Sequence, residues 1–125
     1  MAENKTGEGR MTAGRTTFQL GAALLDACVL GVLAGGDAYG YLLTQQMRQV
    51  VDISESTLYP VLRRLQKEDC LITYDSPVNG RNRRYYALTD KGRGRYAAYA
   101  EEWTRFRSSI DLLLGEKEVK ADEQE

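Results

Sequence analysis

Four stretches of the chain carry apolar residues at a spacing that predicts helices. The first, Thr17–Ala34, is apolar around nearly its whole circumference. We therefore expect a helix that is buried on every side, by its own core and by a partner chain. Gly35 and Gly36 end this stretch, as glycines commonly do after a helix. A second helix is expected over about Ala38–Val50, with Asp37 as its N-cap.

The third and fourth stretches are amphipathic. Ser54 is a candidate N-cap for a helix over Ser54–Lys67, whose apolar residues fall at i, i+3, i+4 and i+7, the spacing of one helix face. Pro60 lies past the first turn of this helix, where we expect it to remove one backbone donor and to bend the axis. The fourth helix is expected over about Asp90–Leu114, with Thr89 as its N-cap.

The fourth helix also carries a heptad seam. Its apolar residues are spaced alternately by three and four positions, the pattern with which one helix packs against another. A small domain has little of its own to bury against such a seam, so the pattern predicts a homodimer, and the apolar first helix fits the same interface. The residues expected at that interface are Leu20, Leu24, Tyr96, Tyr99, Trp103, Phe106, Ile110 and Leu113.

Two strand signals separate the third and fourth helices. Leu71–Pro77 and Arg83–Leu88 are partly β-branched or aromatic, and Asn79-Gly80 lies between them, which is a strong hairpin signal. Three helices followed by a hairpin is the layout of a winged helix-turn-helix, so we expect a mainly α fold with one β-hairpin. The expected divisions are a disordered arm (1–16), a winged-helix domain (17–89), a dimerisation helix (90–114) and an acidic disordered tail (115–125).

Charge is distributed unevenly along the chain. The formal net charge is −1, which by itself does not suggest a partner of high charge. Between Arg63 and Arg107, however, eleven Lys or Arg face six Asp or Glu, whereas Asp111–Glu125 holds six acids and two lysines. The acidic tail thus masks a basic middle, which favours a nucleic-acid partner.

Several classes of protein are disfavoured by the residues present. The chain has no histidine, the commonest general base and metal ligand, and no spacing typical of a zinc site, so we expect no enzyme, no metal and no cofactor. Cys28 and Cys70 are expected as buried free thiols, with a disulfide or a redox sensor as the alternative. The apolar run Phe18–Ala34 loosely resembles a signal peptide, but Asp26 interrupts it and it is shorter than a bilayer span. We expect a cytoplasmic protein without a membrane partner.

The third helix and the hairpin offer the groups that DNA binding needs. Small hydroxyls near a helix start can approach a groove, and basic side chains further along reach phosphates or guanine edges. This helix alone is explained equally well as a solvated face. The hairpin favours DNA, because it carries three arginines and no acid between Asp75 and Asp90. The candidate DNA-binding residues are Ser54, Ser56, Thr57, Tyr59, Pro60, Arg63, Arg64, Lys67, Arg81, Arg83 and Arg84.

Three segments resemble the PadR family of transcriptional regulators. They read ESTLYPVLRRLQKEDCLI (55–72), NGRNRRYYALTDKGR (79–93) and, upstream, LGVLAGGDAYGYLLTQQM (30–47). The likeness spans about residues 20–114, and the single last helix resembles the small subfamily. One departure is Asp69-Cys70, which stands where Glu/Asp-Gly is usual, so the turn there must form without glycine.

The resemblance implies a dimeric repressor that binds a two-fold symmetric double-stranded operator and is released by a small-molecule effector. It implies that the third helix enters the major groove and that the wing contacts the backbone or the minor groove, with the Tyr59 hydroxyl on a phosphate. It also implies that Trp103 can stack on a planar aromatic ligand, although simple packing at a dimer interface is the stronger alternative; Arg107, one turn on, would favour an anionic or phenolic ligand. The alternative function is a winged-helix protein-interaction module that does not bind DNA.

Overall fold

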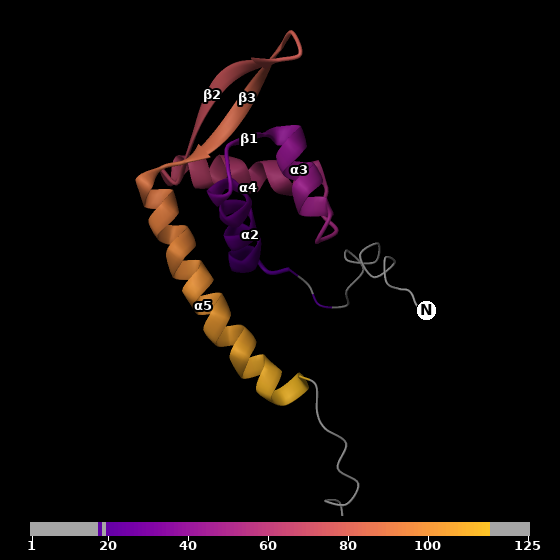
Figure 1. Ribbon diagram of the computed structural model, residues 1–125, viewed down its shortest axis with the longest axis vertical. Helices are drawn as coiled ribbons and strands as arrows, with labels where there is room; N and C mark the ends of the chain where they lie inside the picture. The colour runs from indigo at the N-terminus through magenta and orange to yellow at the C-terminus, as the bar shows by residue number, and fades with distance from the viewer. Residues whose placement is uncertain (1–17, 19, 116–125) are drawn as a thin grey trace, which may run out of the picture.

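The computed structural model describes residue 18 and residues 20–115, which form helices around a small antiparallel sheet (Figure 1). This arrangement confirms the predicted mainly α fold with a hairpin. In chain order the elements are α2 (Ala22–Ala34), β1 (Ala38–Tyr39), α3 (Gly40–Arg48), α4 (Glu55–Lys67), β2 (Leu71–Val78), β3 (Arg81–Leu88) and α5 (Asp90–Leu114).

Helix α2 runs through the middle of the domain, where it packs against α3, α4 and α5. Val29 and Leu30 of α2 are fully buried, as are Leu58 and Leu62 of α4. The helix begins at Ala22 after an extended N-cap residue, later than predicted, and Thr17 lies outside the described residues. The first turn of α2 is exposed in the single chain, and this is the part of the helix that the predicted partner chain would have to cover.

The second predicted helix starts later than expected, because its first two residues form a strand. Ala38 and Tyr39 make β1, which pairs antiparallel with Tyr86 and Tyr85 of β3. Helix α3 therefore begins at Gly40, with Tyr39 at its N-cap position. The prediction that Asp37 caps this helix was wrong. Its carboxylate instead accepts a hydrogen bond of 2.7 Å from the Tyr74 hydroxyl.

Helix α4 begins as predicted, since Ser54 Oγ accepts a hydrogen bond from the Thr57 amide at 3.3 Å. The helix continues past Pro60 to Lys67. It ends in a turn in which Asp69 takes the left-handed conformation, with φ 64°. The amide of Cys70 donates to the Leu65 carbonyl at 2.9 Å, and that of Asp69 to the Gln66 carbonyl at 3.0 Å. This is a Schellman motif formed without glycine.

The hairpin has the predicted turn and longer strands than predicted. Asn79 and Gly80 alone connect β2 to β3, and both have positive φ, 53° and 79°. Two central residues with positive φ make a type I′ turn, which matches the twist of the flanking strands. The sheet order is β1-β3-β2.

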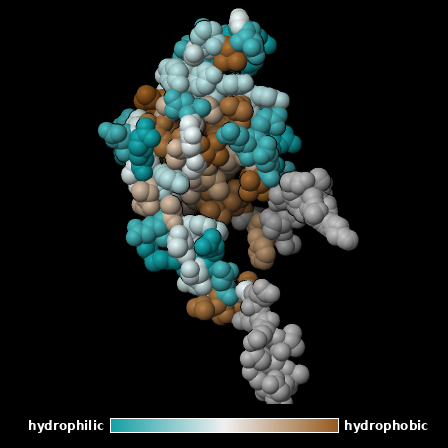
Figure 2. Space-filling view, viewed as in Figure 1, coloured by the Kyte–Doolittle hydropathy of each residue, from teal (hydrophilic) through white to brown (hydrophobic). Residues whose placement is uncertain are grey.

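Helix α5 leaves the body of the domain and extends well beyond it (Figure 1). Thr89 caps it as predicted: Thr89 Oγ1 accepts from the Gly92 amide at 2.9 Å and donates to the Asp69 carbonyl at 2.6 Å. A Cβ at Gly92 would overlap the carbonyl oxygen of Cys70, so this position needs glycine for close approach. Figure 2 shows hydrophobic side chains around the core and again at the far end of α5.

Some of the exclusions drawn from the sequence can be compared with the described residues. Cys28 and Cys70 are free thiols, as predicted; Cys70 is buried, but the prediction that Cys28 is buried was wrong, since it is only half-buried. Within residues 20–115 no helix is long and apolar enough to cross a membrane. The same part of the chain brings together no group of three or more potential metal ligands.

Candidate nucleic-acid interface

The exposed face of α4 carries basic and small polar side chains in the predicted order. Ser56 and Thr57 are exposed in the first turn, whereas Arg63 and Lys67 are exposed further along. A hollow on this face is lined by Pro60, Arg63, Arg64, Gln66 and Lys67. The opposite face, with Leu58, Val61, Leu62 and Leu65, is buried. The helix thus presents one polar face that carries the kinds of groups that contact phosphates and base edges.

Hydroxyl groups cluster at the start of this helix. Ser54 Oγ lies 3.0 Å from Ser56 Oγ and 3.2 Å from Thr57 Oγ1. These contacts order the small side chains while leaving them on the surface. An incoming phosphate would meet hydroxyl donors and the positive end of a helix together.

Tyr59 lies at the joint between α4 and α3. Its ring packs against the core, and a Cβ at Gly40 would lie 2.8 Å from the Tyr59 hydroxyl oxygen. Gly40 therefore leaves the space that the phenol occupies. Burial raises the pKa of Tyr59, and Glu55 and Tyr86 raise it further. The hydroxyl stays protonated at neutral pH and can donate to a phosphate.

Arg64 lines the hollow on the exposed face of α4 with a side chain that is 41% exposed, yet its guanidinium is held by acidic partners. Its guanidinium pairs with Oδ1 of Asp26 on α2 at 2.5 Å, and it also reaches Glu68 at 3.6 Å. The sequence offered no sign of this contact, because the two partners are 38 residues apart. Arg64 is therefore held by two acidic side chains from within the domain.

The three wing arginines lie on two different faces of the hairpin. Side chains alternate along a strand, so Arg84 shares a face with Tyr86, which packs on the core, and Arg81 and Arg83 share the other. Arg84 Nε lies 3.7 Å from Asp75 on the neighbouring strand, with both side chains mostly exposed. A pair this exposed is weak and can be exchanged for a phosphate.

The outer face of the sheet holds a row of three tyrosine rings. Tyr85 stacks on Tyr74, with ring centroids 5.3 Å apart, and meets Tyr39 edge-on at 5.4 Å. The guanidinium of Arg83 lies over the Tyr39 ring at 4.9 Å, a cation–π contact. Its Nε is buried and finds no hydrogen-bond acceptor among the described residues. Arg83 thus stabilises the wing, whatever its outer nitrogens bind.

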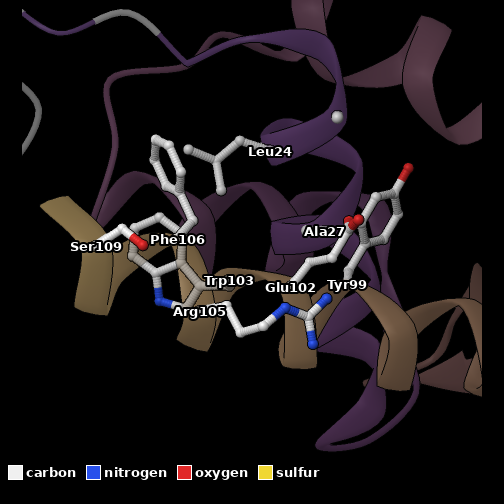
Figure 3. Close-up of a pocket in the computed structure, with 9 residues that line it drawn as sticks. Leu24, Ala27, Tyr99, Glu102, Trp103, Arg105, Phe106 and Ser109 are labelled. Atoms are coloured by element: carbon white, nitrogen blue, oxygen red, sulfur yellow. The ribbon is translucent and has the colours of Figure 1, made fainter.

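A cleft of about 610 Å³ separates α2 from the middle of α5. Its volume falls in the range of small-molecule sites. Figure 3 shows Leu24, Trp103 and Phe106 gathered at one end and Tyr99 with Glu102 toward the other. Trp103 and Phe106 lie 6.1 Å apart. The full lining is Ala23, Leu24, Ala27, Tyr99, Glu102, Trp103, Arg105, Phe106 and Ser109.

Arg107, which the sequence paired with Trp103, does not line this cleft. At 3.6 residues per turn, Arg107 lies about 120° around the helix from the middle of the cleft face. Glu102 and Arg105 are the charged residues of the lining, and neither was predicted from the residue pattern. The cleft therefore offers one acid and one base rather than a single cation.

The seam residues predicted for a dimer divide into two groups. Tyr96 and Tyr99 pack against the domain's own core, as does Leu20, and Leu24 lines the cleft. The rest of the seam turns outward: Trp103 is 42% exposed, Phe106 58% and Leu113 71%, whereas Ile110 is partly buried. An apolar surface of this kind is typical of an interaction site.

Comparisons with known proteins point to one family. A family model described as transcriptional regulator PadR-like family matches residues 29–98. Transcriptional regulator Rv3488 of Mycobacterium tuberculosis is 38% identical over 99 residues, 78% of this chain and 88% of the relative.

Solved structures give the same result. The crystal structure of smu.1704 from Streptococcus mutans UA159 has a TM-score of 0.74 at 32% identity, covering 83% of this chain and all 100% of that one. A PadR-like transcriptional regulator (BC4206) from Bacillus cereus has a TM-score of 0.70 at 28% identity, covering 75% and 94%. The family model, the mycobacterial relative and the Bacillus cereus structure are all described as transcriptional regulators, and none as an enzyme.

Proposed function

Because the chain belongs to the PadR-like family of DNA-binding transcriptional regulators, we propose that it binds a two-fold symmetric operator as a homodimer, with one α4 in each of two major grooves. The two half-sites would lie about one helical turn of DNA, or a multiple of it, apart. The observation that carries this proposal is the exposed stripe of α4, with hydroxyls at its start and Arg63 and Lys67 further along.

The wing completes the proposed interface. Arg84 extends from the face of β3 that carries Tyr86, the neighbour of Tyr59 on α4, so it lies on the α4 side of the hairpin. Arg81 borders the two-residue turn at the tip. These two side chains would contact phosphates or the minor groove, while Arg83 contributes the remainder of the positive charge.

The homodimer is supported by the outward-facing part of α5. Phe106 and Leu113 are mostly exposed in the single chain, and covering them with a second copy would remove that apolar surface from water. A two-fold axis beside α5 would also place two α4 helices on one side of the assembly, which is what a two-fold operator requires.

DNA binding is tested with a labelled duplex from the region upstream of the chain's own gene and a scrambled duplex of equal length. Arg63→Ala should weaken the upstream duplex by about ten- to a hundredfold, as expected for loss of a base contact, with less effect on the scrambled one. Arg81→Ala and Arg84→Ala should weaken both duplexes alike, and each should lower the salt slope, the decrease of log affinity with log salt concentration, by about one. Equal binding by wild type and all three variants at physiological salt would contradict the proposed interface.

Within this proposal, the protein acts as a repressor that a planar aromatic molecule in the α2–α5 cleft releases from DNA. The support is the aromatic wall made by Trp103 and Phe106 and the volume of the cleft. Because Glu102 and Arg105 both line it, planar cations and planar phenolates are both to be tried. Trp103 is the single tryptophan of the chain, so quenching of its emission reports binding directly. Absence of quenching by either class would rule out this effector site.

A further inference from the structure

Four charged side chains connect the DNA-facing helix to both walls of the Trp103 cleft. Arg64 of α4 pairs with Asp26 of α2, and Glu68 at the end of α4 pairs with Arg95 of α5, each at 2.5 Å. Arg64 and Glu68 also approach each other at 3.6 Å. Asp26, Arg64, Glu68 and Arg95 are called the charge chain below.

The two ends of the charge chain adjoin the cleft. Asp26 precedes Ala27, a cleft residue on α2, and Arg95 lies one turn before Tyr99, a cleft residue on α5. The two middle residues of the charge chain, Arg64 and Glu68, lie in the last turns of α4 and at its end. The walls of the cleft and the C-terminal half of α4 are therefore held by the same set of ion pairs.

Asp26 is buried, so its carboxylate depends on the ion pair with Arg64. The Asp26 side chain is 8% exposed, and a buried carboxylate requires a partner. Arg64 supplies it from α4, which packs against α2, so its guanidinium is committed to Asp26. At the other end, the hydrogen bond from Arg95 holds the pKa of Glu68 below its usual value, and Arg64 lowers it further, so Glu68 is charged at neutral pH.

We propose that Arg64 is a positioning residue and not a DNA contact: through the charge chain it sets the orientation of α4 relative to α2 and α5. Affinity for DNA then depends on Asp26 and Arg95, which do not touch it, and a change of spacing between the cleft walls reaches α4 through the same pairs. This inference rests on the proposed binding of DNA by α4. It replaces the expectation that Arg64 itself contacts the operator.

The first test asks whether removing the negative charge of Asp26 strengthens or weakens binding to DNA. Removing the negative charge of Asp26 should strengthen binding to DNA if charge alone matters, and should also free Arg64 to reach a phosphate. The charge chain predicts the reverse: Asp26→Leu weakens binding to the upstream duplex by about five- to tenfold. Arg64→Gln weakens it by a similar factor, and the double variant is no weaker than either single one. Salt slopes stay at the wild-type value, because no phosphate contact has been lost.

The second test uses a matched pair on α5. Arg95→Gln and Arg93→Gln remove the same charge two residues apart, and the Arg93 side chain is exposed and does not belong to the charge chain. Arg95→Gln should weaken binding more than Arg93→Gln by about threefold or more. Trp103 emission should change when wild type or Arg93→Gln is saturated with the duplex, and should change less in Arg95→Gln. All variants are compared well below their thermal midpoints, so that loss of folded protein does not mimic loss of affinity.

The outcomes separate this inference from the proposed function. Failure of wild type to bind either duplex removes the proposed function. If wild type binds, two results together overturn the inference and make Arg64 a DNA contact. Asp26→Leu would bind as tightly as wild type or more tightly, and Arg64→Gln would lower the salt slope by about one. Should Asp26→Leu not fold, the Arg95 and Arg93 pair decides: equal affinities, or no emission change at Trp103 in wild type, overturn it.

Discussion

Replacing Asp69 by glycine should stabilise the protein. Asp69 follows the last turn of α4 with φ 64°, a conformation that costs an L-residue roughly 1–2 kcal/mol, with Asp and Asn toward the lower value. Glycine avoids this cost but loses about 0.5–1 kcal/mol through its greater freedom in the unfolded chain. The Asp69 carboxylate also lies at the negative end of α4, where removing it gains about 0.3–1 kcal/mol. The expected net gain for Asp69→Gly is about 1 kcal/mol.

Three substitutions at this position separate the two contributions. Asp69→Asn removes the charge and keeps a residue that tolerates the left-handed region, so about 0.5 kcal/mol is expected. Asp69→Ala removes the charge but fits that region poorly, and should be no more stable than wild type. The hydrogen bond from Thr89 Oγ1 is to the backbone carbonyl of Asp69, so it survives in every variant. The expected order of stability is glycine, asparagine, then wild type with alanine.

The assay is thermal unfolding followed by circular dichroism at one protein concentration, since a dimer's midpoint depends on concentration. For a folded unit of about a hundred residues, 1 kcal/mol corresponds to roughly 5 °C. A glycine variant no more stable than the asparagine variant would refute the argument from backbone conformation. A glycine variant less stable than wild type would mean that the Asp69 side chain stabilises the turn.

Two further predictions concern glycines that lie against other elements. Gly40→Ala would bring a Cβ to 2.8 Å from the Tyr59 hydroxyl oxygen, so the tyrosine ring should swing aside. Affinity for the upstream duplex should fall about threefold to tenfold, with little change in thermal midpoint. Unchanged affinity would remove Tyr59 from the interface. In Gly92→Ala the new Cβ would overlap the backbone carbonyl of Cys70, and the free energy of unfolding in urea should fall by about 2–4 kcal/mol. Gly94→Ala lies on the same helix with open space around it, so the free energy of unfolding should stay the same or rise by up to about 1 kcal/mol. Similar effects at both positions would disprove the close contact.

Local signals in the sequence predicted the elements well. The hydroxyls of Ser54 and Thr89 cap α4 and α5 as expected, and Asn79-Gly80 forms the tight turn. Each of these features depends on residues within four positions of one another, so the sequence displays it directly. The prediction that Asp37 caps the second helix was wrong for the opposite reason. Its neighbours pair with a strand almost fifty residues further on, and a long-range ladder overrides a local cap.

The candidate site was harder to predict than the fold, because long-range contacts reassign its side chains. Arg64 had the residue type and spacing of a DNA contact, but a buried carboxylate 38 residues away takes its guanidinium. Arg83 was read as one of three equivalent wing arginines, and the alternation of β3 places it over Tyr39 instead. Nothing in the residue pattern marks Asp26 as a partner beyond its being a charge in an apolar helix.

The residues on which the family resemblance rests are mainly those that join elements together. Gly40 makes room for Tyr59 between α3 and α4, Tyr85 holds the three strands in an aromatic row, and Gly92 lets α5 approach the Cys70 carbonyl. Such packing residues determine the fold and the placement of α4. In the proposed function, base recognition depends instead on exposed side chains such as Ser56 and Arg63. A family resemblance that rests on such packing residues therefore predicts the shape of the DNA-binding surface more firmly than the DNA sequence that this surface recognises.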